Sequence, residues 1–218
     1  EQVVLSWARQ TEELMAAGWE QVFIFENNGS VVGVSNPHPH CQIYAFPFAV
    51  DAIQREIEAA KAHYEEVKRS LFDEIIEAER LDGRRMLLDE HDWTVFVPYF
   101  AQFPFEMMLV PQRSMATLAE ATDAELRGLA GALKVSLQRL DRVLGQAQSY
   151  ILSVHQAPSA WLLAEAPGAY STYVHIQPFL RAPSLQKFLA GIETAAGQFL
   201  NDAAPEEHAD ALRRVVLA

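Results

Sequence analysis

Alternation of apolar and polar residues predicts a set of short strands near the start of the chain. QVFIFE at 21–26 is rich in β-branched and aromatic residues, and the turn signal NNG follows it at 27–29. We therefore expect a hairpin in which 30–34 pairs with 21–26, followed by a third strand at 42–46. The opening segment EQVVLSWARQTEEL has the pattern of an amphipathic helix and not that of a signal peptide.

From residue 49 onward the apolar spacing changes from twos to threes and fours. This pattern predicts one helix over 49–80, which the LDG signal ends. Thr122 and Glu125 have capping-box spacing and are predicted to begin a helix that runs to about residue 144. Further strands are predicted at 85–88, 94–99, 105–110, 150–155 and 172–179, and further helices at 184–196 and from Pro205. This order indicates an α+β fold, an antiparallel sheet with helices packed on it.

The composition is that of an ordinary globular protein with an acidic balance. Of the 218 residues, 50% are hydrophobic and 21% are charged, and the apolar runs are too short for a membrane helix. A net charge of −12 without a basic stripe argues against a nucleic-acid partner. The lone Cys41 excludes an internal disulfide and makes a cytoplasmic location the expectation. Because no initiator methionine opens the chain, we expect the natural protein to be longer.

The densest candidate chemistry lies in the stretch NPHPHCQIY. Alternation places His38, His40 and Gln42 on one face, while the two prolines keep the backbone stiff and extended. A neutral imidazole is a good nucleophile towards phosphorus near pH 7, provided that an acceptor on its other ring nitrogen fixes the tautomer. A backbone carbonyl near His38 could be that acceptor. The candidate donors to the phosphate oxygens are Gln42, Ser35 and Asn27.

Spacing alone leaves two other interpretations of the histidine pair open. A His-x-His pair on a strand is also a metal-ligand pattern, and a purely structural pair of surface histidines is the third possibility. The isolated histidines lie among charged residues, and we expect them to be solvated; they are His63, His91 and His208.

The stretch GVSNPHPHCQIYAFP resembles the active-site segment of the galactose-1-phosphate uridylyltransferase family, a branch of the histidine-triad superfamily. Other segments resemble the same family, so the likeness spans nearly the whole chain: FENNG, VPYFAQFPFEMMLVP and KFLAGIETAAGQFLNDAAPEEHADALR. The resemblance implies a histidine-triad-like fold, half of a pseudo-duplicated transferase plus part of the other half. Residues 1–218 would be its C-terminal portion, with the active-site strands and helix in 1–80 and the second half in 81–218.

The resemblance also implies a ping-pong transfer of a uridylyl group from UDP-glucose to galactose 1-phosphate, without an organic cofactor. His40 would attack the α-phosphorus and form a uridylyl-histidine. The residues that match phosphate-contacting positions of the family are Asn27, Ser35, His38 and Gln42. Lys187 and Glu193 match residues that reach the hexose, in the family from the neighbouring subunit of a homodimer. On sequence alone, an exposed helix face is the simpler interpretation of these two residues.

A structural zinc or iron site is a further implication of the resemblance. Glu56, His155 and His175 match three of the four ligands, and the fourth position holds Tyr173 in the segment TYVH. The alternative without a metal is a hydrogen-bonded pair of His155 and His175 with Glu56 as counter-charge. His38 matches a position that binds zinc in some members, but the other ligands there belong to a segment that this chain does not contain, so we expect no zinc on it.

Two other functions stay open at this stage. A histidine-triad relative could use the same nucleophile on an adenylyl donor, as a transferase, phosphorylase or hydrolase. A degenerate half-domain could bind sugar phosphates without catalysis, although the intact set of residues around His40 argues against it. If the N-terminal half of the fold were truly absent, exposed edge strands would make the transfer doubtful.

Overall fold

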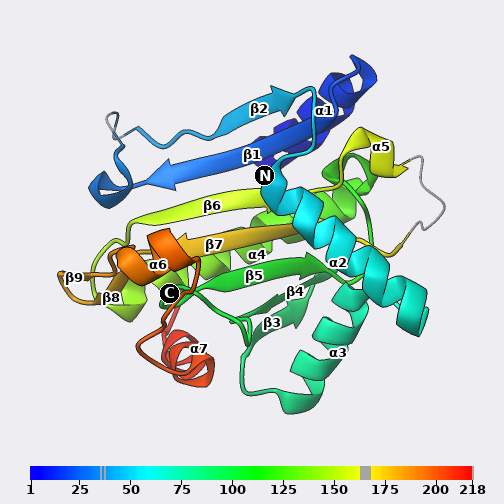
Figure 1. Ribbon diagram of the computed structural model, residues 1–218. Helices are drawn as coiled ribbons and strands as arrows, with labels where there is room; N and C mark the ends of the chain where they lie inside the picture. The colour runs from blue at the N-terminus through cyan, green and yellow to red at the C-terminus, as the bar shows by residue number, and fades with distance from the viewer. Residues whose placement is uncertain (35, 37, 163–167, 218) are drawn as a thin grey trace.

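A seven-stranded antiparallel sheet organises the protein in the computed structural model, which describes residues 1–34, 36, 38–162 and 168–217 (Figure 1). The strand order is β2-β1-β6-β7-β5-β4-β3. Its strands are β1 (Gln21–Asn28), β2 (Gln42–Phe46), β3 (Met86–Glu90), β4 (Trp93–Phe96), β5 (Met107–Pro111), β6 (Tyr150–His155) and β7 (Tyr173–Pro178). A two-stranded sheet is formed by β8 (Leu180–Ala182) and β9 (Leu185–Gln186).

Helices cover both faces of the large sheet (Figure 1). On one face lie α1 (Gln2–Ala16) and α4 (Asp123–Val143), and on the other lie α2 (Asp51–Val67) and α3 (Leu71–Asp82). The shorter helical segments are η1 (Ser30–Val32), η2 (Leu118–Glu120), α5 (Ser159–Leu162), α6 (Gly191–Ala196) and α7 (Pro205–Arg213). The predicted α+β class is therefore confirmed. No helix within the described ranges is long and apolar enough to span a membrane.

Two apolar cores join the layers, one on each face of the sheet. The first includes Trp7 of α1, Leu129 of α4 and Ile24 of β1. The second joins Phe72 of α3 to Met108 of β5 and other side chains from the opposite face of the strands. Because successive side chains of a strand point to opposite faces, β5 serves both layers, with Met107 and Leu109 in the first core and Met108 and Val110 in the second. Burying each such side chain stabilises the fold by about 1.5–3 kcal/mol.

The hairpin partner of β1 is not the predicted one. Residues 30–34 form no strand, and β2 is the strand that pairs with β1 on that side. Gly29 explains the departure, because its φ of 92° takes the chain out of the sheet and a Cβ there would lie 2.1 Å from Ser149 Oγ. The connection between β1 and β2 is consequently a long loop, and this loop carries His38 and His40.

The predicted helix over 49–80 is two helices. Lys68 ends α2 in the left-handed conformation, with φ 59°, and α3 begins after Ser70. The change of direction lets Phe72 and Ile76 enter the second core. The apolar period predicted one continuous helix and missed the break, since no glycine or proline marks Lys68.

The predicted helix over 184–196 is also wrong in its first half. Ser184 has a positive φ of 58°, Leu185–Gln186 form β9, and α6 begins only at Gly191.

His208, expected to be solvated, is 5% exposed and lies against the ring of Phe105. The predicted division of the chain near residue 80 stays a prediction. Strands from both sides of residue 80 belong to the same seven-stranded sheet.

Candidate active site and the neighbouring cavity

The ring of His40 is oriented by its own loop. Its Nδ1–H donates a hydrogen bond to the carbonyl oxygen of His38 at 2.8 Å. An imidazole with its proton held on Nδ1 presents an unprotonated Nε2. The residue is exposed, so its ring can be approached from solvent. The prediction that a backbone carbonyl near His38 fixes this tautomer is confirmed.

The two sides of the loop are held by local hydrogen bonds. The backbone N–H of His38 donates to Asn36 Oδ1 at 3.1 Å, and its Nδ1–H donates to the carbonyl oxygen of Pro39 at 3.1 Å. On the other side of the loop, the indole N–H of Trp7 donates to the sulfur of Cys41 at 3.2 Å. Cys41 is therefore packed against α1.

The predicted phosphate-binding residues lie on the strands that flank this loop. Gln42 begins β2, and its Oε1 accepts a hydrogen bond from the Tyr44 hydroxyl at 3.1 Å, which leaves its amide N–H groups as donors. Asn27 lies near the end of β1 and lines a cavity. Ser35 falls outside the described residues. Phosphate binding by these side chains stays a prediction.

Glu26 is a residue that the sequence analysis missed. Its carboxylate accepts a hydrogen bond from the Tyr150 hydroxyl at 3.1 Å. Burial raises the pKa of Glu26, while the Tyr150 hydrogen bond and, when its ring is protonated, the nearby His40 act to lower it. An acidic residue within the apolar strand QVFIFE was the available signal for a carboxylate near the histidine loop.

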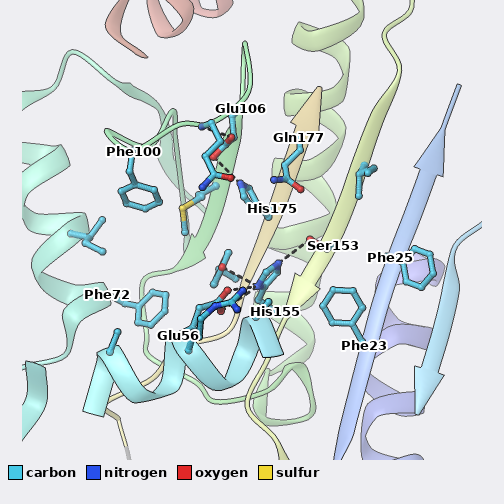
Figure 2. Close-up of a pocket in the computed structure, with 18 of the residues that line it drawn as sticks. Phe23, Phe25, Glu56, Phe72, Phe100, Glu106, Ser153, His155, His175 and Gln177 are labelled. Carbon is cyan, nitrogen blue, oxygen red and sulfur yellow. Dashed lines mark hydrogen bonds and ion pairs between the residues drawn. The ribbon is translucent and has the colours of Figure 1, made fainter. Parts of the chain in front are cut away.

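A cavity of about 840 Å³ lies between the sheet and the helices α2 and α3 (Figure 2). Three strands line it with alternate residues, as the period of two requires. These residues are Phe23, Phe25 and Asn27 of β1, Ile151, Ser153 and His155 of β6, and Tyr173, His175 and Gln177 of β7. Asn27 thus links the cavity wall to the strand end from which the histidine loop departs.

Glu56 and His155 meet at the α2 side of this cavity. His155 Nδ1 lies 2.9 Å from Glu56 Oε1, and the Tyr170 hydroxyl donates to Glu56 Oε2 at 3.1 Å. The Tyr173 hydroxyl is 2.9 Å from the same ring nitrogen. Burial alone would raise the pKa of Glu56, but the hydrogen bonds from His155 and the two tyrosines lower it below its ordinary value. Glu56 is therefore an anion held by three donors.

His175 is bonded to a different carboxylate. Its Nε2 lies 2.9 Å from Oε1 of Glu106, which is 1% exposed and also accepts the backbone N–H groups of Gln102 and Phe103. Figure 2 shows the two histidines directed to separate acids. Glu106 was missed by the sequence analysis, although an acidic residue between FPF and MMLVP marked it.

These residues do not fit a shared metal ion as they are arranged. Within the described part of the chain, no group of three or more His, Cys, Asp or Glu side chains is placed to hold one. The predicted pairing of His155 with His175 is also absent as a hydrogen bond, since their ring centres are 5.8 Å apart and each ring bonds its own carboxylate.

Lys187 and Glu193 are paired with each other and are not on an exposed helix face. Lys187 Nζ lies 3.7 Å from Glu193 Oε1, and the two residues are 6% and 9% exposed. Lys187 also donates to the carbonyl oxygen of Leu200 and lies over the ring of Phe103. Neither residue is among the described side chains that line the cavity.

Known proteins are similar to this chain in sequence and in fold. Galactose-1-phosphate uridylyltransferase of Rattus norvegicus is 35% identical over 97% of this chain and 55% of its own length. The protein of the same name in Thermotoga maritima is 35% identical over 98% of this chain and 66% of its own length. A solved structure described as a uridylyltransferase has a TM-score of 0.90 at 31% identity, over 97% of this chain and 66% of that one.

The fold is therefore that of a uridylyltransferase. The family model for the C-terminal domain of galactose-1-phosphate uridyl transferase matches residues 56–218, and the model for the N-terminal domain matches residues 1–49. The chain belongs to the galactose-1-phosphate uridylyltransferase family, as the resemblance implied. It spans little more than half of the rat protein and about two thirds of the Thermotoga protein.

Proposed function

We propose that the protein transfers a uridylyl group from UDP-glucose to galactose 1-phosphate through a covalent uridylyl-histidine at His40. The observation that carries the proposal is the 2.8 Å hydrogen bond from His40 Nδ1–H to the carbonyl of His38. It supports a neutral ring whose Nε2 lone pair is available at an exposed position. Membership of the family supplies the donor and the acceptor.

The proposed cycle has two balanced substitutions at the same phosphorus. In the first, the Nε2 lone pair forms an N–P bond to the α-phosphorus of UDP-glucose, and the P–O bond to glucose 1-phosphate breaks with its electrons. In the second, a phosphate oxygen of galactose 1-phosphate attacks that phosphorus, and the N–P bond electrons return to His40. UDP-galactose leaves, and the histidine is regenerated for the next cycle.

Side chains around the loop would bind the transferring phosphoryl group. The free amide donors of Gln42, the amide of Asn27 and the ring of His38 flank the loop and can donate to phosphate oxygens. Ser35 would join them by its place in the motif. No step of this cycle passes through a metal ion.

The hexose would be bound by Lys187 and Glu193, which a partner subunit of a homodimer would supply. The support for a subunit interface here is the segment around the buried Lys187–Glu193 pair. This segment carries exposed apolar side chains of the kind that subunit interfaces cover. These side chains are Leu185, Phe188, Leu189 and Ile192. A cytoplasmic location and the lack of a nucleic-acid partner rest on the lone cysteine and the acidic charge.

The test is the intact mass of the full-length protein after mixing with UDP-glucose. We expect one added uridylyl group on the wild type, its discharge by galactose 1-phosphate, and no adduct on His40→Asn. His91→Asn is the matched control, because His91 is an exposed histidine far along the chain in a turn after β3.

Three outcomes would contradict the proposal. The first is a wild type that forms no adduct with UDP-glucose, and the second is an adduct that persists on His40→Asn. An adduct formed from ADP-glucose but not from UDP-glucose would instead identify an adenylyl donor, with the nucleophile retained.

A further inference from the structure

We propose that the Glu56–His155 pair, closed by two tyrosine hydroxyls, fastens α2 to strands β6 and β7 without a metal ion. The tyrosines are Tyr170 and Tyr173, and Tyr173 stands where the resemblance implies a histidine ligand. The proposal replaces the implied metal site by a network of this chain's own residues. It does not depend on which nucleotide the protein transfers.

Both ring nitrogens of His155 already have partners. Nδ1–H donates to Glu56 Oε1 at 2.9 Å, and Nε2 lies at hydrogen-bond distance, 3.0 Å, from the Ser153 hydroxyl oxygen (Figure 2). A metal ion takes the lone pair of a ring nitrogen, so binding at Nδ1 would break the bond to Glu56. Binding at Nε2 would break the bond to Ser153. Both nitrogens of the ring are thus engaged in hydrogen bonds within the network.

The tyrosines act as hydrogen-bond donors and not as ligands. The Tyr170 hydroxyl donates to Glu56 Oε2 at 3.1 Å, and the Tyr173 hydroxyl lies 2.9 Å from His155 Nδ1, so both hydroxyls already have hydrogen-bond partners within the network. The Tyr173 ring also stacks on the ring of His155, with centroids 4.5 Å apart, which fixes the imidazole plane.

His175 is engaged elsewhere and cannot supply a third ligand without losing its own partner. Its Nε2 lies 2.9 Å from Glu106, whose other oxygen accepts two backbone N–H groups at 2.8 Å each. Pulling the imidazole away would leave a carboxylate that is almost fully buried with one hydrogen-bonding oxygen unpaired, which is unfavourable. Two separate histidine–carboxylate pairs therefore occupy the region of the implied site.

The first experiment measures metal on the untagged wild-type protein. After dialysis against a chelator and then against metal-free buffer, Co²⁺ is titrated in and visible absorption is followed. Elemental analysis after Zn²⁺ loading gives the stoichiometry. We expect no band that saturates at one equivalent and a Tm unchanged by EDTA. One tightly bound equivalent, with a Tm lowered by EDTA, would overturn the proposal.

The second experiment restores the implied ligand. Tyr173→His should gain a Co²⁺ band that saturates at one equivalent, because a second imidazole then supplies the third ligand beside Glu56 and His155. Tyr173→Phe is the matched control: it keeps the stacked ring, removes the hydroxyl, and should lower Tm without binding Co²⁺. A folded Tyr173→His variant that binds no Co²⁺ would contradict the proposal that the Tyr173 hydroxyl stands in place of a histidine ligand. If that variant does not fold, the wild-type titration still decides.

Discussion

The Nδ1 nitrogen of His40 lies 2.8 Å from the carbonyl oxygen of His38, two residues earlier in the same loop. The ring of the proposed nucleophile is thus oriented by the backbone next to it. Changes that disturb the course of the loop should therefore affect the ring more than changes of side chains around it. The glycines that begin this loop offer the most direct comparison.

Gly29→Ala should lower the free energy of unfolding more than Gly33→Ala. Both glycines have positive φ, 92° and 77°, and alanine in the left-handed conformation of Gly33 costs about 1–2 kcal/mol. Only at Gly29 would the new methyl group also collide, 2.1 Å from Ser149 Oγ and 2.8 Å from Ser149 Cβ. Urea unfolding of the two variants measures the difference. Equal losses of unfolding free energy would show that the chain around Ser149, just before β6, shifts to accommodate the methyl group.

Glu56→Gln should remove a pH-dependent part of the stability. The pKa of Glu56 is lowered in the folded protein, so its contribution is fully present above the ordinary value of 4.5 and is lost as pH falls through the folded pKa. Near neutral pH we expect Glu56→Gln to cost about 1–3 kcal/mol, the range for a disrupted buried hydrogen-bond partner. The difference from wild type should shrink below pH 4.5.

Unfolding by urea at neutral and acidic pH measures this difference. Glu66→Gln on the exposed side of the same helix is the matched control, and it should leave stability near the wild-type value. A Glu56→Gln deficit that stays constant down to acidic pH would contradict the assignment of Glu56 as the anion of the network.

Arg85→Met should destabilise the protein by about 3–5 kcal/mol, because it leaves a buried carboxylate without its counter-charge. Arg85 Nε lies 2.8 Å from Glu79 Oε2, and the same guanidinium donates to Glu206 at the start of α7. Arg84→Met is the control, since the Arg84 side chain is 67% exposed. Thermal unfolding of both variants is the measurement, and losses of similar size would argue that the burial of Arg85 has no energetic weight.

Glu125→Gln should make the protein less sensitive to acid. The Arg113 guanidinium, followed by the Thr122 hydrogen bonds, lowers the pKa of Glu125 to about 2. Its stabilising contribution is therefore present above pH 4.5 and is lost between that pH and about 2. The measurement is the unfolding free energy from pH 5 down, compared with wild type. If the unfolding free energies of the variant and the wild type fall in parallel as pH decreases, the ionised Glu125 carboxylate does not contribute to the acid sensitivity.

Thr122→Ala tests the same helix start by a different route. The Thr122 hydroxyl accepts from the backbone N–H of Glu125, and the Glu125 carboxylate accepts from the backbone N–H of Thr122. Loss of such a cap costs about 1 kcal/mol. Circular dichroism during thermal unfolding should show the corresponding decrease, and Thr122→Ser should restore most of it.

Local patterns in the sequence predicted the elements that local physics determines. The alternation in QVFIFE predicted β1, the capping-box spacing of Thr122 and Glu125 predicted the start of α4, and the carbonyl partner of His40 lay only two residues away. Each of these features depends on residues that are close together in the sequence.

Features that depend on distant contacts could not be predicted in this way. The false hairpin arose because the close approach of Gly29 to Ser149, which sends the chain out of the sheet, is invisible in the sequence. The salt bridge of Glu106 with His175 joins two strands that are adjacent only in the folded sheet. Lys187 was expected to be exposed because no residue close to it in the sequence indicates that the ring of Phe103 covers its side chain.

The strand β6 contacts the chain on both sides of the segment that runs from β1 through the His40 loop and β2 to α2. Before the loop, β1 is hydrogen-bonded along β6, with Asn27 opposite Ile151; after the loop, α2 is tied to the same strand through Glu56 and His155. The two contacts with β6 therefore enclose a segment of which the His40 loop and β2 are parts. A substitution at Glu56 that displaces α2 is expected to alter the position of the His40 loop through β2, although Glu56 lies on a different element.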